Sequence, residues 1–182
     1  MKKGLVMEGG AMRCMFTAGV TDTLMKAGID FDGAIGVSAG AAFGCNYKSR
    51  QIGRVLRYNV KYASDPRLSS WQSWLKTGDL YGADFCYHDL PVKLDIFDTV
   101  AFQKNSIDFW YVATDINNGE AIYHKLILGK EANLQWIRAF SSIPVFAQPV
   151  EIGSRKYWDG GISNSIPIKF FEKLATIRTL SF

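Results

Sequence analysis

The pentapeptide at residues 36–40 reads Gly-Val-Ser-Ala-Gly and places Ser38 two residues from a glycine on either side. This Gly-x-Ser-x-Gly pattern is typical of a nucleophile elbow, a sharp turn from a strand into a helix with the serine at its apex. Gly36 and Gly40 leave room for the strained backbone of such a turn. The helix N-terminus also supplies free N–H groups and a partial positive charge beside the serine oxygen. A plain glycine-rich turn is the alternative interpretation of these residues alone.

A serine nucleophile needs a base that takes its proton. The chain has two histidines, His88 in a polar loop and His124 within a predicted strand, and neither has the glycine-rich, strand-end setting of a catalytic base. Asp159 is better placed, since it ends an apolar segment and precedes Gly160 and Gly161. A carboxylate can serve as general base where dry surroundings raise its basicity. Asp159 is the favoured base, with an ordinary Asp-Gly turn and a histidine-dependent hydrolase as the alternatives.

Donors for an oxyanion are predicted in the glycine-rich segment near the N-terminus. Gly9, Gly10, Ala11 and Met12 follow a short apolar run and enter a helix, where successive N–H groups form an anion-binding nest. Arg13 comes next and either orients this loop, meets an anionic head group or lies on the surface. The segment is a weak candidate for a phosphate-binding loop, because it lacks both the full Gly-x-Gly-x-x-Gly pattern and the Walker lysine.

These segments lie at the junctions of predicted secondary-structure elements. The start of the chain alternates short apolar runs with stretches whose apolar residues recur at helical spacing. It predicts strands at residues 4–7 and 31–37 and helices at 11–27 and 38–46. Such an alternation indicates an α/β fold with a parallel sheet. Its connections are right-handed, so the C-terminal ends of both strands should meet at one edge, with Ser38 beside the loop at residues 8–10.

The rest of the chain continues this alternation, with one segment that is harder to interpret. Residues 64–90 carry Trp71, Trp74 and Phe85 between turn signals. They predict either short helices packed over the core or an aromatic lid or acyl-chain wall beside the elbow. The further predictions are helices at 51–63, 94–100, 130–140 and 167–174, and strands at 107–115, 121–128, 148–152, 156–158 and 176–182.

Length and composition narrow the classes of protein to which the chain can belong. A chain of 182 residues, 48% hydrophobic and 21% charged, predicts one globular domain over residues 1–182. A net charge of +4 without a dense basic run argues against a nucleic-acid partner. The three cysteines form neither a metal-ligand spacing nor a disulfide framework, so we expect a reducing compartment, no metal and no cofactor. No signal peptide or membrane span is predicted, which favours the cytoplasm.

In this order, the three segments resemble the motifs of the patatin-like phospholipase family. That family carries Gly-Gly-Gly-x-Arg/Lys-Gly, Gly-x-Ser-x-Gly and Asp-Gly-Gly/Ala, which here correspond to residues 9–14, 36–40 and 159–161. Residues 16–20, 139–144 and 162–167 are similar too. The resemblance therefore covers nearly the whole chain.

The resemblance implies a three-layer α/β sandwich with a mostly parallel central sheet and a nucleophile elbow between strand and helix. It implies a catalytic dyad of Ser38 as nucleophile and Asp159 as base, with N–H groups of residues 9–12 as oxyanion donors. The implied activity is that of a serine lipid acyl hydrolase, of the phospholipase A, lysophospholipase or carboxylesterase type. Lipids or small esters would be its substrates, and peripheral contact with a membrane is a further expectation. The supporting residues are Arg13, Gly36, Gly40, Gly160 and Gly161.

The chain departs from the family pattern at two residues and in length. The third glycine of the first motif is Ala11 and the last is Cys14. Ala11 can still donate its N–H, although a Cβ costs roughly 1 kcal/mol if the loop needs a positive φ there. The chain also ends soon after its Asp-Gly-Gly motif, so we expect a domain shortened at the C-terminus. Its last strand would then be an edge strand, open to pairing with another copy. A catalytically silent binding or regulatory protein is the alternative that these departures motivate.

Overall fold

The computed structural model describes residues 2–127, 132–174 and 177–181 of the chain. The element ends predicted at residues 128, 130, 176 and 182 lie outside the described residues, as do the outer limits of the predicted domain.

The described strands form one mixed sheet in the order β5-β6-β3-β2-β1-β7, with β4 also paired to β3. The pairs β1–β2, β1–β7 and β2–β3 are parallel. β4 and β6 run antiparallel to β3, and β5 runs antiparallel to β6. Because two reversals restore the direction, β5 points the same way as the parallel strands, and the prediction of a mostly parallel sheet is confirmed. The strands are β1 (Lys2–Met7), β2 (Gly33–Val37), β3 (Asp108–Asp115), β4 (Ala121–Lys125), β5 (Val150–Ile152), β6 (Arg155–Asp159) and β7 (Ile177–Ser181).

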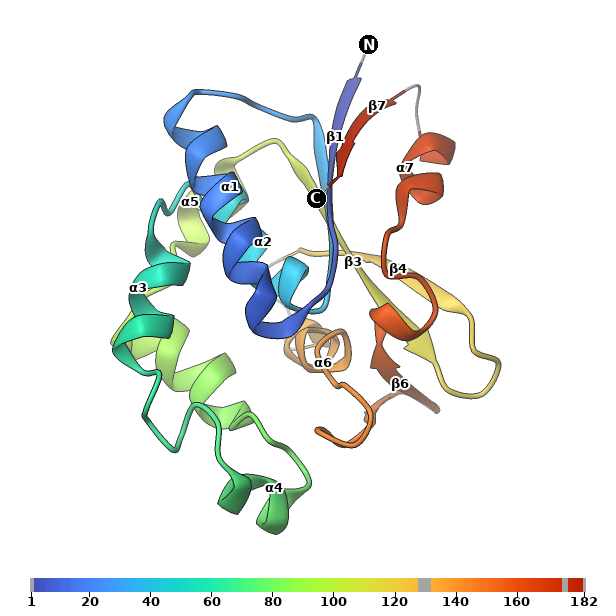
Figure 1. Ribbon diagram of the computed structural model, residues 1–182. Coiled ribbons are helices and arrows are strands. Elements are labelled where there is room, and N and C mark those ends of the chain that lie inside the picture. Colours follow the sequence, from blue (N-terminus) through green and yellow to red (C-terminus); the bar gives the residue numbers. More distant parts are fainter. Residues whose placement is uncertain (1, 128–131, 175–176, 182) are drawn as a thin grey trace.

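Helices cover both faces of this sheet, as Figure 1 shows. Alternate residues of a strand point to opposite faces. Leu5 of β1 accordingly packs into a cluster with Tyr47 and Phe109, while Val6 packs with Phe171 on the other face. The first face is covered by α1 (Met15–Lys26), α2 (Ala39–Lys48), α5 (Thr99–Lys104) and α6 (Ala132–Ala139), and the second by α7 (Ile168–Leu174). The predicted α/β sandwich of helix, sheet and helix layers is confirmed.

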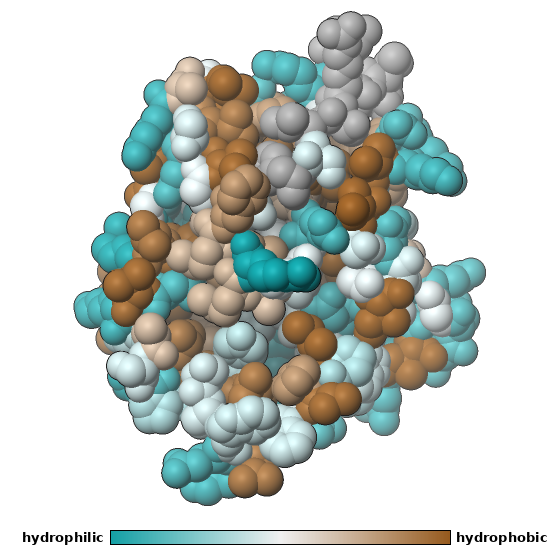
Figure 2. Space-filling view, viewed as in Figure 1, coloured by the Kyte–Doolittle hydropathy of each residue, from teal (hydrophilic) through white to brown (hydrophobic). Residues whose placement is uncertain are grey.

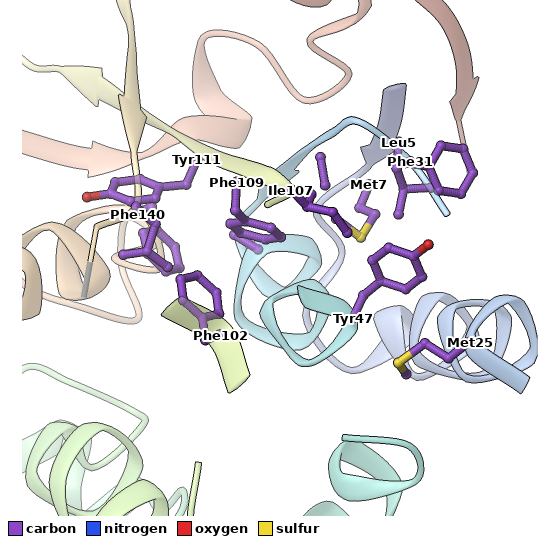
Figure 3. Packing of buried hydrophobic residues seen from close by; sticks show 13 residues of the cluster. Leu5, Met7, Met25, Phe31, Tyr47, Phe102, Ile107, Phe109, Tyr111 and Phe140 are labelled. Carbon is purple, nitrogen blue, oxygen red and sulfur yellow. The ribbon is translucent and has the colours of Figure 1, made fainter. Parts of the chain in front are cut away.

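The larger core cluster joins the sheet to the helices of the first face (Figure 3). Tyr111 of β3 packs against Phe140 with ring centroids 4.7 Å apart, and Phe102 of α5 meets Phe109 at 6.2 Å. Tyr47 of α2 is fully buried. Each large apolar side chain buried in this way stabilises the fold by roughly 1.5–3 kcal/mol. The cluster fixes α2 on the sheet.

Several predicted helices differ from the structure at their ends. The helix predicted at residues 11–27 begins as a 3-10 turn, η1 (Ala11–Cys14), before α1. The prediction of a helix at residues 94–100 is wrong. The chain leaves a π-helical segment, η2 (Phe85–Leu94), and α5 starts only at Thr99 because the Asp98 side chain caps it by accepting from the Ala101 N–H at 2.8 Å.

The segment between α2 and β3 adds short elements outside the core layers. They are α3 (Arg54–Lys61), α4 (Trp71–Thr77), η2 and α5, with an isolated bridge between Ser69 and Tyr81. Figure 1 shows α4 projecting away from the sheet. In the part of the chain that the structure describes, every helix is too short or too polar to cross a bilayer.

Candidate active site

The chain turns sharply at Ser38, between the end of β2 at Val37 and the start of α2 at Ala39. Ser38 has φ 53° and ψ −129°, a conformation that residues with a Cβ rarely adopt. Such strain persists only where the surrounding structure fixes it, and it is concentrated at functional sites. The side chain is buried, at 6% exposure. The nucleophile elbow predicted between strand and helix is therefore present.

Gly36 and Gly40 permit this elbow because other backbone passes too close for any side chain. A Cβ on Gly36 would lie 2.4 Å from a Cα of α2, and a Cβ on Gly40 would lie 2.4 Å from the carbonyl oxygen of Glu8. The loop after β1 therefore touches the elbow directly. A Cβ on Gly9 in that loop would lie 2.9 Å from the Ser38 Cβ. The predicted contact between this loop and the serine is present.

β2 and β6 end beside each other along β3. Val37, the last residue of β2, lies opposite Val112 of β3, and Asp159, the last residue of β6, lies opposite Ala113. β4 pairs with β3 at residues 110–114, so it occupies one side of β3 and leaves β2 and β6 to share the other. The two strand ends are then only about 3.3 Å apart along β3. This register brings the carboxylate of β6 to the serine that follows β2.

Hydrogen bonds hold Asp159 from several directions. Its N–H donates to the Ser142 carbonyl oxygen at 2.9 Å, and its own carbonyl oxygen accepts from the Thr114 hydroxyl at 2.8 Å. Its Oδ1 accepts from the N–H of Gly161 at 2.7 Å. Gly160 lets the turn form against β3, because a Cβ there would lie 2.3 Å from a β3 carbonyl oxygen. The backbone and one carboxylate oxygen of Asp159 are thus fixed.

The second carboxylate oxygen of Asp159 has a lone pair that could accept a proton. Oδ2 is buried and has no hydrogen-bond partner among the described residues. Burial raises the pKa of the Asp159 carboxyl above its ordinary value, while the Ser38 hydroxyl and the Gly161 N–H act in the opposite direction. The Ser38 hydroxyl is therefore near enough to the carboxylate to lower its pKa, while Oδ2 accepts no hydrogen bond from the described residues. Catalytic contacts are often loose in the absence of substrate.

The loop after β1 presents unused donors. Among residues 2–127, 132–174 and 177–181, the N–H groups of Gly9, Gly10, Ala11 and Met12 donate to no acceptor. Ala11 and Met12 line the same cavity as Ser38, whereas Gly9 and Gly10 do not. Four successive free N–H groups can bind an anion or a developing oxyanion.

The residues that depart from the family pattern fit the loop in different ways. Ala11 has φ 47°, so its Cβ is strained by roughly 1 kcal/mol. Cys14 is buried, and its Sγ–H donates to the Glu8 carbonyl oxygen at 3.4 Å. Arg13 donates its N–H to the Gly10 carbonyl oxygen at 3.0 Å, and its exposed side chain folds back beside Gly10. Arg13 does not line the cavity, so its position is that of a residue that orients the loop.

A cavity of about 380 Å³ opens beside Ser38. This volume lies within the range of small-molecule sites. Its lining is mostly apolar and comes from α2, α3, η2, α6 and the turn that follows α6. Such a cavity suits an apolar group attached to the atom that Ser38 would attack.

The sequence left two interpretations of residues 64–90 open, short helices packed over the core or an aromatic lid or wall beside the elbow. Different parts of this segment behave differently in the structure. Cys86, Tyr87 and Leu90 of η2 line the cavity. α4 has no buried residue, and Trp71 is 65% exposed. Trp74 ties α4 to the turn after α6 through a hydrogen bond from Nε1 to the Val145 carbonyl oxygen at 2.6 Å. The later part of the segment is a cavity wall, and α4 lies outside it. Figure 2 shows apolar residues in several separate groups on the visible face rather than in one belt.

Neither histidine lies at this site. His124 is half-buried in β4 and stacks on Trp136 with centroids 4.6 Å apart, and its burial lowers its pKa. His88 is exposed on η2. Neither lines the cavity with Ser38. In the described part of the chain, no group of three or more histidine, cysteine or carboxylate side chains is arranged to hold a metal.

Two residues that support Asp159 were not singled out from the sequence. Thr114 lies on β3 and Ser142 in the turn after α6, and each bonds to the backbone of Asp159. The signal for Ser142 was its place in residues 139–144, which resemble a family segment. No local signal marked Thr114, since its role depends on the pairing of β3 with β6.

Comparisons with known proteins show what the chain is similar to in sequence and in fold. Residues 5–171 match the family model described as patatin-like phospholipase. The uncharacterized protein YjjU of Escherichia coli (strain K12) is 34% identical over 172 residues, which cover 91% of this chain and 47% of YjjU. The crystal structure of VipD from Legionella pneumophila is similar in fold, with a TM-score of 0.56 at 13% identity, over 99% of this chain and 49% of that one. The chain spans about half the length of these relatives.

Proposed function

The chain belongs to the patatin-like phospholipase family, and from this premise we propose that it is a serine lipid acyl hydrolase that uses a Ser38–Asp159 dyad. The family supports a lipid acyl hydrolase. The dyad is our own assignment. The observation that carries it is the buried Oδ2 of Asp159, which has no hydrogen-bond partner in the described part of the chain and lies beside a serine in a strained elbow. A catalytic base must have a free lone pair near the proton that it takes, and Oδ2 offers one.

The proposed reaction has two stages that share the same groups. Asp159 takes the hydroxyl proton of Ser38 while Oγ attacks the ester carbonyl carbon. N–H groups of Gly9, Gly10, Ala11 and Met12 stabilise the oxyanion that forms. The intermediate then collapses, the C–O bond to the alcohol breaks, and the alcohol leaves with the proton held by Asp159. In the second stage Asp159 deprotonates a water molecule that attacks the acyl-enzyme, which releases the carboxylic acid and restores Ser38.

The apolar cavity supports a lipid or small ester as substrate, either a phospholipid or lysophospholipid or a simpler carboxylic ester. The proposed setting is the cytoplasm, with peripheral contact at the membrane where lipid substrates lie. β7 is an edge strand of the described sheet, and pairing of β7 with a second copy is part of the proposal.

A fluorophosphonate with a short alkyl group tests the proposal, because it reacts only with an activated serine. We expect one adduct per chain on Ser38, located by peptide mass spectrometry, together with hydrolysis of p-nitrophenyl butyrate. Ser38→Ala should remove both, and Ser64→Ala, at an exposed serine, should change neither. An unlabelled Ser38 in a folded protein without esterase activity would support the alternative of a catalytically silent family member.

A further inference from the structure

The turn that follows the proposed base contains two adjacent glycines. Gly160 is required by packing, because a Cβ there would lie 2.3 Å from the Val112 carbonyl oxygen. Gly161 supplies the N–H from which Asp159 Oδ1 accepts at 2.7 Å. Glycine has the greatest backbone freedom of any residue, so local geometry alone fixes the direction of this N–H poorly. The turn therefore depends on contacts from outside it.

Thr114 of β3 supplies such a contact. Its hydroxyl donates to the Asp159 carbonyl oxygen at 2.8 Å, and the residue is 4% exposed. A peptide group is planar, so holding this oxygen also fixes the N–H of Gly160 and the direction in which the turn begins. The hydrogen bond thereby restricts where the Gly161 N–H can point. The carboxylate is restricted in the same way, since its Oδ1 accepts from that N–H and its Oδ2 is attached to the same carbon.

Ser163 donates a hydrogen bond to Thr114. The two side-chain oxygens lie 2.8 Å apart. A threonine hydroxyl has one proton, and a carbonyl oxygen can only accept. Because the Thr114 proton goes to the Asp159 carbonyl oxygen, Ser163 must be the donor in the hydroxyl pair. The other acceptor near Ser163, the Gly160 carbonyl oxygen, is more distant, at 3.4 Å. Ser163 therefore orients the Thr114 hydroxyl toward Asp159.

The backbone of the turn places Ser163 for this contact. The N–H groups of Ser163 and Asn164 both donate to the Gly160 carbonyl oxygen, at 3.2 and 2.9 Å. The Asn164 side chain donates in turn to the Tyr123 hydroxyl of β4 at 2.7 Å. The end of the turn is thus attached to the sheet through side chains of both β3 and β4.

We infer that Thr114 and Ser163 are positioning residues that act through Asp159. Their hydrogen bonds keep the turn closed on Oδ1, so that Oδ2 stays in place for the Ser38 proton. Neither residue lines the cavity, so both contribute to the rate of the chemical step and not to substrate binding. This inference rests on the proposed dyad and adds two residues on which its geometry depends.

Replacement of Thr114 with and without loss of its hydroxyl tests this role. A displacement of about 1 Å in a catalytic group can cost 100-fold in rate, so Thr114→Val, which keeps the shape of the side chain, should lower kcat for p-nitrophenyl butyrate at least about tenfold. KM should stay within about twofold, and Thr114→Ser should keep kcat within about threefold of the native value. Thr21→Val is the matched control and should leave kcat unchanged. Thr21 is a buried threonine of α1 whose hydroxyl donates to the Ala18 carbonyl oxygen at 3.0 Å.

Two further readouts distinguish positioning from a general loss of stability. The hydrogen bond from the Gly161 N–H lowers the pKa of Asp159, against the effect of burial. Since Thr114→Val loosens this hydrogen bond, the acidic limb of the profile of kcat/KM against pH should move to higher pH, and Thr21→Val should leave it in place. Amide exchange at Gly161, followed by NMR, should accelerate at least about tenfold in Thr114→Val and not in Thr21→Val.

Ser163→Ala provides the test if Thr114→Val fails to fold. Thr114 keeps its own hydrogen bond to Asp159 in this variant, so kcat should fall by only about threefold, with the acidic limb again moved to higher pH. Ser165→Ala, at an exposed serine of the same segment, is the matched control and should change neither quantity.

The outcomes separate the inference from the proposed function. Faster exchange at Gly161 in Thr114→Val, in a protein whose native form hydrolyses no ester, would contradict the hydrolase and keep the hold on the carboxylate. An inactive Asp159→Asn beside a native kcat and an unmoved acidic limb in Ser163→Ala and in folded Thr114→Val would overturn the inference and keep the hydrolase. A loss of kcat in Thr114→Ser as large as that in Thr114→Val would also overturn it, because the hydroxyl is the group that acts.

Discussion

The N–H of Asp159 donates a hydrogen bond to the carbonyl oxygen of Ser142 at 2.9 Å. Ser142 belongs to the turn after α6, and this turn also lines the cavity. The Ser142 hydroxyl in turn donates to the Arg138 carbonyl oxygen at 2.7 Å, which ties the turn to the last residues of α6. The proposed base is thus anchored to the element that encloses the proposed substrate.

Asp159→Asn should remove most of the activity and leave the fold intact. The amide keeps the shape of the carboxyl group but cannot take the Ser38 proton, and general-base catalysis typically contributes 10²–10⁴-fold. We expect kcat/KM for p-nitrophenyl butyrate to fall at least 100-fold with an unchanged circular dichroism spectrum. Asp84→Asn, at an exposed residue, is the matched control. Near-native activity of Asp159→Asn would exclude this residue as the base.

The acidic limb of the pH–rate profile should follow the ionisation of the Asp159 carboxyl. Burial raises its pKa above the ordinary value of 3.8, and only the ionised form can act as base. Activity should therefore be low when the carboxyl is protonated and should rise with pH through a midpoint above 3.8. The measurement is kcat/KM between pH 3.5 and 8, with circular dichroism to confirm folding at each pH. A limb centred at or below 3.8 would contradict the buried setting of this group.

Ala11→Gly should stabilise the protein and retain activity. Ala11 has φ 47°, where glycine avoids a Cβ strain of roughly 1 kcal/mol. We expect the free energy of unfolding in urea to rise by up to about 1 kcal/mol. Ala27 has φ −79° at the end of α1, so Ala27→Gly should instead lower it by roughly 0.5–1 kcal/mol. Equal effects of the two substitutions would show that Ala11 is unstrained.

Gly40→Ala should disrupt the site, whereas Gly19→Ala should not. A Cβ on Gly40 would lie 2.4 Å from the Glu8 carbonyl oxygen and 2.6 Å from that of Met7, so the loop after β1 must shift. A shift of about 1 Å in a catalytic group can lower the rate 100-fold. Gly19 lies in α1 with no neighbour within 4 Å of an added Cβ, and alanine there should stabilise the helix by about 1 kcal/mol. Esterase assays and urea unfolding of both variants measure the contrast.

Asp95→Asn should destabilise the cavity wall at neutral pH. The carboxylate of Asp95 pairs with buried Arg54 at 3.3 Å and with Arg57 at 2.8 Å. Loss of one partner of a buried pair typically destabilises by about 3 kcal/mol. The hydrogen bond from Arg57 leads the causes that lower the pKa of Asp95, so this stabilisation is present above pH 3.8 and is lost as pH falls through the lowered pKa. Urea unfolding at pH 7 and at acidic pH measures it.

A surface pair provides the control for this substitution. Asp89 pairs with Lys93 one helical turn away, and Asp89→Asn should leave the free energy of unfolding nearly unchanged at either pH. If Asp95→Asn were as mild as Asp89→Asn, the Arg54–Asp95 pair would contribute nothing to the wall.

The sequence predicted best what depends on a few adjacent residues. The elbow needs small residues within five positions, so Gly36 and Gly40 mark it directly. The strands and most helices were also predictable, because apolar spacing is a local pattern. α5 was misplaced, since a single capping residue, Asp98, decided where it begins.

The parts that the sequence could not predict depend on residues far apart in the chain. Thr114 supports Asp159 across a separation of 45 residues, and only the register of β3 with β6 brings them together. The meeting of the ends of β2 and β6 on one side of β3 likewise depends on strand pairing between residues far apart in the chain. Residues 64–90 were ambiguous because their aromatic side chains fit a core or a wall equally well, and packing decided that η2 lines the cavity while Trp71 stays exposed.

β3 contributes neither residue of the proposed dyad, yet it sets the spacing between the two. Val37 and Asp159 are held opposite its consecutive residues Val112 and Ala113. The cavity is lined instead by α2, α3, η2, α6 and the turn after α6. A change in α3 or η2 would therefore alter the shape of the cavity without touching the strand pairing that spaces Ser38 and Asp159. The geometry of the proposed chemistry and the shape of the proposed binding space are set by different elements of the fold.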